Sequence, residues 1–361
     1  MTVCSRGCKK RPVRVVIIGA GVMGCATALE LSRRGVRDII LLERAVPGAE
    51  ASSAAAGMLA AQVESKDEAE RALFVRARER YPAWAAELRE TTGVDIGYRR
   101  SGALEIATTS EQVEALRARV AAHRAFGLRA ELLDSAAARK VEPELSPEMA
   151  CAAHFPDEAQ VDPPQLLRAL VAAIARAGIE VRSGATVASI IEEQGRCAGV
   201  ALDSREVLHA DAVVLAAGSW SSLVPGIPSA VPPVRPVRGQ LVMLEERPPR
   251  LSSIVFHHHA YVVPRGDGRV ICGATTENVG HRREVTAAGV HSILASAIRI
   301  APGLGAAELS RAWCNFRPQS EGGPHVGRSS VPGLFLATGH YRNGILLAKA
   351  SAETVAEAIS H

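Results

Sequence analysis

The chain has 361 residues, 47% of them apolar, which is long enough for two domains with a large core. Five of its basic residues lie within the first fourteen positions, where no acidic residue occurs. The remainder has 37 basic and 38 acidic residues, so we expect no basic surface that would bind nucleic acid.

The N-terminal region is expected to begin with a disordered basic tail over residues 1–12. The apolar run Val15–Leu29 resembles a secretory signal, but three glycines interrupt it and no convincing cleavage site follows. No other stretch reaches the about 20 apolar residues that a membrane helix needs. The seven cysteines lack pairing or metal-ligand spacing, which favours a cytoplasmic chain with free thiols.

The next segment predicts a strand, a glycine turn, a helix and a second strand. β-Branched residues fill positions 15–18, helical spacing follows, and the strand that starts at Asp38 ends at Glu43. A strand, helix and strand within about 30 residues form the unit that builds a parallel sheet.

The glycines of this unit have the spacing of a dinucleotide-binding turn. Gly19, Gly21 and Gly24 allow a tight turn, close approach to a pyrophosphate and packing of the helix on the strand. Glu43 is placed to accept hydrogen bonds from a ribose diol. The pattern does not separate FAD from NAD, and a purely structural βαβ unit is the alternative.

Further elements follow along the chain. They are helices at 69–90 and 110–126, a helix that Asp162 caps and that runs to Gly178, strands at 179–182 and 212–218, short antiparallel strands from 231 to 273, a strand at 333–339 and a helix from Gly344. The pattern predicts an α/β fold combined with antiparallel β structure, in which a Rossmann-like nucleotide-binding domain is interrupted by a second domain. We assign 13–88, 148–222 and 318–361 to the first domain, and 89–147 and 223–317 to the second.

Four blocks identify the family that the chain resembles. They are the small-residue run 50–58, Tyr261-Val-Val-Pro-Arg, Trp313-Cys-Asn-Phe-Arg-Pro, and Gly339-His-Tyr-Arg-Asn-Gly-Ile-Leu-Leu-Ala. These blocks resemble the glycine oxidase and D-amino acid oxidase superfamily, and the last is similar to the glycine oxidases of bacterial thiamine synthesis. The resemblance covers residues 13–361.

The resemblance implies that the dinucleotide is FAD and that a mainly antiparallel sheet binds the substrate. The expected cofactor-binding residues are Gly19, Gly21, Val22, Met23, Gly24, Glu43, Arg44, Ala51, Ser52, Ala56, Gly57, Met58, Val187, Ala217, Gly218, Trp220, His340, Tyr341, Arg342, Asn343, Gly344, Ile345 and Leu346. The helix that begins at Asn343-Gly344 would stabilise negative charge on the reduced flavin through its N-terminal dipole.

The candidate substrate residues are Arg342, Tyr261, Arg317 and His259. Arg342 lies at a loop tip, and its planar guanidinium matches a carboxylate. The resemblance implies that Tyr261 and Arg317 also lie near the substrate. A core tyrosine is the alternative for Tyr261, and a surface arginine on a loop is the alternative for Arg342. His259 is expected on the same strand face as Tyr261. We expect no metal site, because consecutive histidines on a strand point to opposite faces.

Two positions depart from the family pattern. The family has a methionine near the substrate where this chain has Thr276, so we expect a changed pocket volume. Cys314 lies roughly where related sarcosine oxidases have a cysteine bonded to the flavin. A buried structural thiol is the alternative for Cys314.

The expected reaction is oxidation of a small amino acid, with glycine first and sarcosine or small D-amino acids next. Hydride transfer to flavin N5 would give an imine, then an oxo acid and ammonia, and dioxygen would become hydrogen peroxide. The alternatives are a D-amino acid or secondary-amine dehydrogenase with another acceptor, and a flavin-binding protein without turnover. The resemblance also implies a role in thiamine thiazole synthesis and a possible homodimer or tetramer.

Overall fold

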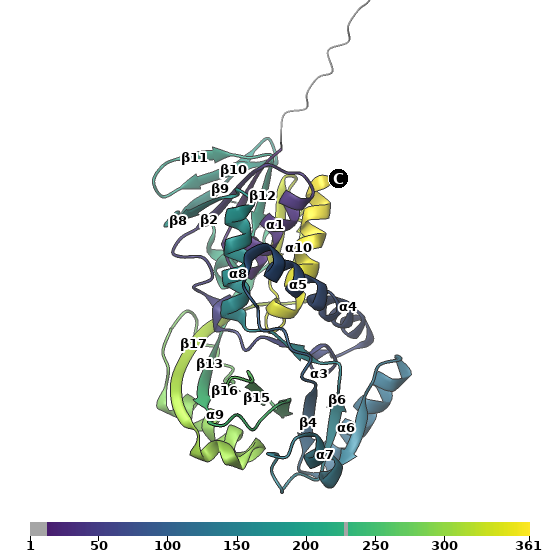
Figure 1. Ribbon diagram of the computed structural model, residues 1–361. Coiled ribbons are helices and arrows are strands. Elements are labelled where there is room, and N and C mark those ends of the chain that lie inside the picture. The colour runs from purple at the N-terminus through teal and green to yellow at the C-terminus, as the bar shows by residue number, and fades with distance from the viewer. Residues whose placement is uncertain (1–12, 227–229) are drawn as a thin grey trace, which may run out of the picture.

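A computed structural model describes residues 13–226 and 230–361, so the predicted N-terminal tail lies outside the described residues. Two large sheets organise the chain (Figure 1). The first has six strands in the order β18 (His325–Arg328), β19 (Leu334–Thr338), β12 (Ala212–Leu215), β1 (Arg14–Ile18), β2 (Asp38–Glu43) and β8 (Glu180–Ser183). All its neighbours are parallel except β18 and β19.

The second sheet has eight strands and is mainly antiparallel, as predicted. Their order is β17 (Glu308–Ser320), β13 (Val234–Glu245), β16 (Arg269–Gly273), β15 (Ala260–Pro264), β14 (Ile254–His257), β4 (Ala103–Ala107), β6 (Cys151–Phe155) and β5 (Glu131–Asp134). Only β4 and β14 pair in parallel. The helices around it are α6 (Ser110–Ala125), α7 (Ser135–Val141), α9 (Ala287–Ile300) and the 3-10 helix η3 (Pro302–Ala306).

The six-stranded sheet is covered on both faces. Helices α1 (Val22–Arg33), α8 (Pro163–Arg176) and α10 (Gly344–Ser360) share one apolar core with its strands, and this core includes Ile17 and Leu41. A three-stranded sheet of β9 (Val187–Glu193), β10 (Arg196–Leu202) and β11 (Val207–His209) covers the other face, where Val16 and Ile40 are buried. Such two-sided burial explains the continuous apolar runs of the strands.

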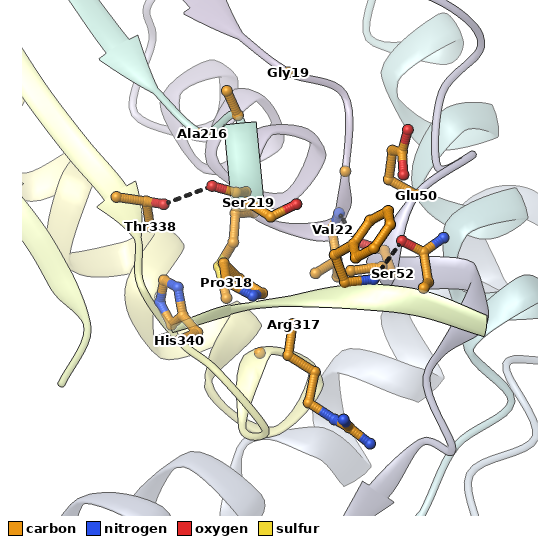
Figure 2. Close-up of a pocket in the computed structure, with 18 of the residues that line it drawn as sticks. Gly19, Val22, Glu50, Ser52, Ala216, Ser219, Arg317, Pro318, Thr338 and His340 are labelled. Carbon is orange, nitrogen blue, oxygen red and sulfur yellow. Dashed lines mark hydrogen bonds between the residues drawn. The ribbon is translucent and has the colours of Figure 1, made fainter. Parts of the chain in front are cut away.

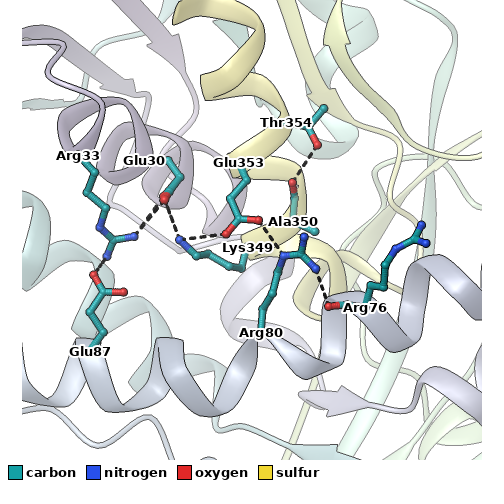
Figure 3. A network of polar contacts seen from close by, with 9 residues as sticks. All are labelled: Glu30, Arg33, Arg76, Arg80, Glu87, Lys349, Ala350, Glu353 and Thr354. Carbon is teal, nitrogen blue, oxygen red and sulfur yellow. Dashed lines mark hydrogen bonds and ion pairs between the residues drawn. The ribbon is translucent and has the colours of Figure 1, made fainter.

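A network of ion pairs ties α1 and α10 to the helices α4 (Glu68–Glu79) and α5 (Tyr81–Thr92) (Figure 3). The Lys349 Nζ lies 2.7 Å from Glu30 Oε1 and 3.4 Å from Glu353 Oε1. Arg80 Nε is 2.7 Å from Glu353 Oε2, and Arg33 joins Glu30 to Glu87. Glu30 is buried, so these cations compensate a carboxylate that has little contact with water.

The remaining short elements lie between the two large sheets. They are α2 (Ala51–Ala54), β3 (Met58–Leu59), α3 (Ala61–Glu64), β7 (Ala159–Gln160) and the 3-10 helix η1 (Gly218–Leu223). β3 and β7 form a two-stranded antiparallel sheet.

Most predicted elements are confirmed within a few residues, and two details differ. The predicted helix 69–90 is two helices, α4 and α5, with Arg80 between them and Pro82 in the first turn of α5. The predicted helix cap at Asp162 is wrong in detail: α8 begins after it, but its carboxylate accepts a 2.8 Å hydrogen bond from Arg269 Nη2 and does not cap the helix.

The position of strand β6 bears on the predicted domain boundary at residue 148. Strand β6 follows residue 148, the predicted return to the nucleotide-binding domain, yet it pairs with β4 and β5 of the eight-stranded sheet. We propose that residues 151–155 belong to the second domain; the other boundaries stay predictions.

In the described part of the chain, no helix has both the length and the apolar character needed to cross a membrane. Within residues 13–226 and 230–361, no group of three or more His, Cys, Asp or Glu side chains is placed to hold a metal ion.

Candidate active site

A cavity of about 340 Å³ lies where the parallel strands end. The residues that directly follow β1, β2 and β12 line it, namely Gly19, Arg44 and Ala216. Ligands of open α/β sheets bind at these carboxyl ends. Strand β17 contributes Arg317 and Pro318 to the cavity wall, and in Figure 2 the Arg317 side chain extends away from the turn that carries Gly19.

The glycine turn brings backbone close to backbone. Gly19 has φ +101°, and a Cβ there would lie 2.6 Å from the Ala216 carbonyl oxygen. A Cβ on Gly24 would lie 1.9 Å from the Gly19 carbonyl oxygen, so helix α1 packs on the turn only without a side chain. The N-cap residue of α1, Gly21, carries no side chain, and the first turn of the helix faces the cavity through Gly21, Val22 and Met23.

Two polar side chains hold this turn in place. The Ser52 Oγ accepts a 3.0 Å hydrogen bond from the Val22 backbone N–H. Glu43 accepts hydrogen bonds from the backbone N–H groups of Ala20 and Ala45, at 3.0 and 2.9 Å. The carboxylate is buried at the end of β2 and lines the cavity.

A stack of side chains includes two residues of the cavity wall, Arg44 and Trp220. The Arg44 guanidinium lies 3.8 Å from the centre of the Trp220 ring, and His281 stacks on the same indole at 3.9 Å. Arg44 and Arg283 both pair with Glu50. Within the described residues, the buried Trp220 Nε1 has no hydrogen-bond partner, which indicates a ligand acceptor at this point.

Tyr261 and Arg317 lie together in the cavity, contributed by β15 and β17. Arg317 Nη1 donates to the Thr275 carbonyl oxygen at 3.1 Å, and its guanidinium lies against the backbone of Gly239, where a Cβ would clash with it. In residues 13–226 and 230–361 no carboxylate pairs with Arg317. Burial raises the pKa of the Tyr261 phenol although the nearby Arg317 opposes this, so the hydroxyl stays protonated.

Arg342 is engaged with an acidic side chain. Its Nη2 donates to Glu64 Oε1 at 3.1 Å, and both side chains line the cavity. His340, two residues earlier, is buried and contacts Ser351 Oγ at 2.9 Å through Nε2. Burial lowers the pKa of His340 to about 3, so its imidazole is neutral near pH 7.

The chain matches one protein-family model over nearly its whole length. The model described as "FAD dependent oxidoreductase" matches residues 14–358. The chain belongs to this family of FAD-dependent oxidoreductases.

Individual members of the family are similar over nearly the whole chain. A glycine oxidase of Geobacillus kaustophilus is 36% identical over 96% of this chain and 92% of its own length. The crystal structure of that enzyme superposes with a TM-score of 0.90, covering 96% of this chain and 94% of the other. A bifunctional protein ThiO/ThiG of Trichormus variabilis is 38% identical over 96% of this chain, which spans about half (52%) of that relative.

The described residues fit the FAD of this oxidoreductase family. The glycine turn and the N-terminus of α1 line the cavity, and a helix N-terminus offers backbone N–H groups to a pyrophosphate. The Trp220 Nε1 atom is a hydrogen-bond donor without a partner among the described residues. Helix α10 begins at Gly344, which lines the cavity. These groups would hold the dinucleotide of an FAD-dependent oxidoreductase.

Most residues expected to bind FAD line the cavity. They are Gly19, Gly21, Val22, Met23, Glu43, Arg44, Ala51, Ser52, Ala56, Gly57, Met58, Val187, Ala217, Gly218, Trp220, His340, Tyr341, Arg342, Asn343, Gly344 and Ile345. Gly24 and Leu346 lie outside it: Gly24 packs against the turn, and Leu346 is buried in the core. The cofactor roles of all these residues remain predictions.

Three sequence expectations need correction. His259 does not share a strand face with Tyr261, because His258 and His259 form the turn between β14 and β15, where His259 is exposed. Thr276 is exposed in the loop after β16 and does not line the cavity, so it does not set the pocket volume. Cys314 is buried and does not line the cavity; burial raises the pKa of its thiol, which favours the structural alternative.

Sequence reasoning missed several lining residues, including Glu64, Ser219, Asn315 and Thr338. Glu64 lies six residues after Met58, at the end of the one-turn helix α3. A single glutamate in a sequence is typical of a solvent-exposed position and does not by itself indicate a site residue. The only sequence signal of Glu64 is this proximity to the small-residue segment.

Proposed function

We propose that this FAD-dependent oxidoreductase oxidises a small amino acid, with glycine as the first substrate and sarcosine or small D-amino acids as further candidates. Glycine, water and dioxygen would give glyoxylate, ammonia and hydrogen peroxide. The names of the similar glycine oxidases support this substrate class. The observation that carries the proposal is Arg317, a cation in the cavity without a carboxylate partner among the described residues, beside the Tyr261 hydroxyl.

The chain's own residues would bind and orient the substrate. Arg317 and the protonated Tyr261 hydroxyl donate hydrogen bonds to the substrate carboxylate, which fixes the position of Cα. FAD, when bound, supplies the hydride acceptor. A substrate amine that binds neutral requires no proton acceptor from the chain.

The biological setting is also proposed. A role in thiamine thiazole synthesis is supported by the resemblance and by the similar ThiO/ThiG proteins. A cytoplasmic location is supported by five free thiols among the described residues, as is usual in a reducing compartment. We propose dioxygen as the electron acceptor.

Anaerobic mixing of the FAD-loaded protein with glycine, sarcosine and D-alanine tests the substrate. The visible absorbance of oxidised flavin should disappear, and readmitted dioxygen should yield hydrogen peroxide. Arg317→Ala should lower kcat/KM by about a hundredfold or more, because it removes charged hydrogen bonds to the substrate. Arg311→Ala, an exposed position of the same strand, is the matched control.

Two results would contradict the proposal. Flavin that is reduced by an amino acid but passes electrons only to an artificial dye excludes the oxidase and favours a dehydrogenase. Flavin that no small amino acid reduces favours a flavin-binding protein without turnover.

A further inference from the structure

The ion pair between Arg342 and Glu64 joins two separate parts of the cavity wall. Glu64 ends helix α3, whereas Arg342 lies in the loop between β19 and α10. Their side chains are 31% and 16% exposed, for Arg342 and Glu64 respectively, so both are largely withdrawn from water but reachable from the cavity.

The position of Glu64 is fixed by the chain around it. The buried Glu158 carboxylate accepts hydrogen bonds from the backbone N–H groups of Ala61 and Gln62, at 2.7 and 2.5 Å. Arg78 lies 3.5 Å from the same carboxylate. Helix α3 is therefore anchored at its start, and its last residue faces Arg342 from a defined turn.

The charges at this end of the cavity are unequal. Arg317 and Arg342 are cationic and Glu64 is anionic, while the Tyr261 phenol is protonated. Glu64 compensates Arg342 but Arg317 has no such partner in the described chain. One uncompensated positive charge matches a ligand with one carboxylate, and a second carboxylate would lie against Glu64 without a free cation.

We propose that Glu64 determines substrate specificity by occupying Arg342, so that the site selects amines with one carboxylate over amines with two. Glycine and sarcosine belong to the first class, and iminodiacetate belongs to the second. Removal of the Glu64 charge frees the Arg342 guanidinium for the second carboxylate. This assignment rests on the proposed amino-acid oxidation, since it specifies the substrate class of that site.

The test compares the binding of two non-oxidisable carboxylates, acetate and malonate, to the FAD-loaded protein. Each is titrated against the visible absorption spectrum of the bound flavin, which needs no turnover. In Glu64→Gln the ratio of malonate affinity to acetate affinity should rise about tenfold, the effect of one freed charged hydrogen-bond donor. With active enzyme, kcat/KM for iminodiacetate relative to glycine should rise in the same direction.

Three control variants separate specificity from structure. Glu64→Asp keeps the charge and should keep the parent ratio. Glu68→Gln removes a charge from an exposed position of the neighbouring helix and should leave the ratio unchanged. In the Arg342→Met background, Glu64→Gln should have no effect on the ratio, because the cation that it frees is absent.

An unchanged or lowered ratio in Glu64→Gln overturns the specificity role, as does an equal rise in Glu68→Gln. If Glu64→Gln does not retain FAD, Glu64→Ala replaces it, and the ratio of malonate affinity to acetate affinity should rise in the same way because the Glu64 charge is again removed. The absorbance titration also separates the two proposals. If no amine reduces the flavin but the malonate ratio rises, the oxidation proposal fails and the role of Glu64 in ligand selection stands.

Discussion

The Arg265 Nη2 atom donates a 2.5 Å hydrogen bond to the Ala56 carbonyl oxygen and so joins strand β15 to the small-residue segment that lines the cavity. Its Nη1 atom also donates to Val161 O and Gln160 Oε1, at 2.7 and 2.9 Å. One side chain therefore connects the second sheet to the backbone that we expect to lie beside the flavin.

Arg265→Met should lower the free energy of unfolding by about 2–4 kcal/mol, because it leaves three inward-facing acceptors without a donor. Retention of FAD should also weaken. Chemical denaturation and the flavin content after gel filtration measure both effects. Arg247→Met, at a side chain that is 83% exposed, should change stability by less than about 0.5 kcal/mol. Equal stability of the two variants would show that the Arg265 contacts contribute little.

Gly24→Ala should prevent FAD binding and destabilise the fold by about 1–3 kcal/mol or more, since the new Cβ would lie 1.9 Å from a backbone oxygen. Flavin content and the unfolding midpoint are the measurements. Gly305→Ala is the control, because its Cβ would meet nothing closer than 3.8 Å. A Gly24→Ala protein with full flavin content would exclude the close packing of α1 on the turn.

His340 should make stability depend on pH in the acidic range. Its pKa is about 3 in the folded chain because burial disfavours the charged imidazole, whereas an unfolded histidine has a pKa near 6.5. The unfolded chain therefore binds a proton that the folded chain does not, and stability present above pH 6.5 is lost as the pH falls toward 3. The slope from this group is about 1.4 kcal/mol per pH unit.

His340→Gln should flatten this slope between about pH 6 and pH 4. Urea denaturation at several pH values measures it, with His209→Gln at an exposed position as the reference. If the slope of His340→Gln equals that of the parent, the imidazole titrates normally in the folded chain.

Lys349→Met should destabilise the helix network of Figure 3 by about 2–3 kcal/mol, because buried Glu30 keeps only Arg33 as a cationic partner. Denaturant unfolding measures the loss. Lys66→Met removes an exposed pair at 3.9 Å and should cost about 0.5 kcal/mol or less. Similar losses in both variants would argue against a special role of the buried carboxylate.

The sequence predicted the nucleotide-binding unit well because its signals are local. The glycine spacing and the β-branched run before it require only neighbouring residues, and β1, α1 and β2 follow as expected. The strand face of His259 was wrong because the two-residue turn at 258–259 carries histidines instead of the usual turn residues. Glu64 and Glu158 could not be found, since their roles depend on contacts 278 and 97 residues away along the chain.

The order of the strands bears on how the chain acquires its structure during synthesis. The central strand β1 pairs with β12, which follows it by almost 200 residues. Strand β12 pairs in turn with β19, which lies more than 100 residues further along the chain. The edge strand β17, which lines part of the cavity, is also made late. The apolar edge of β12 therefore stays unpaired until β19 has left the ribosome, which makes chains that stop before β19 prone to aggregation.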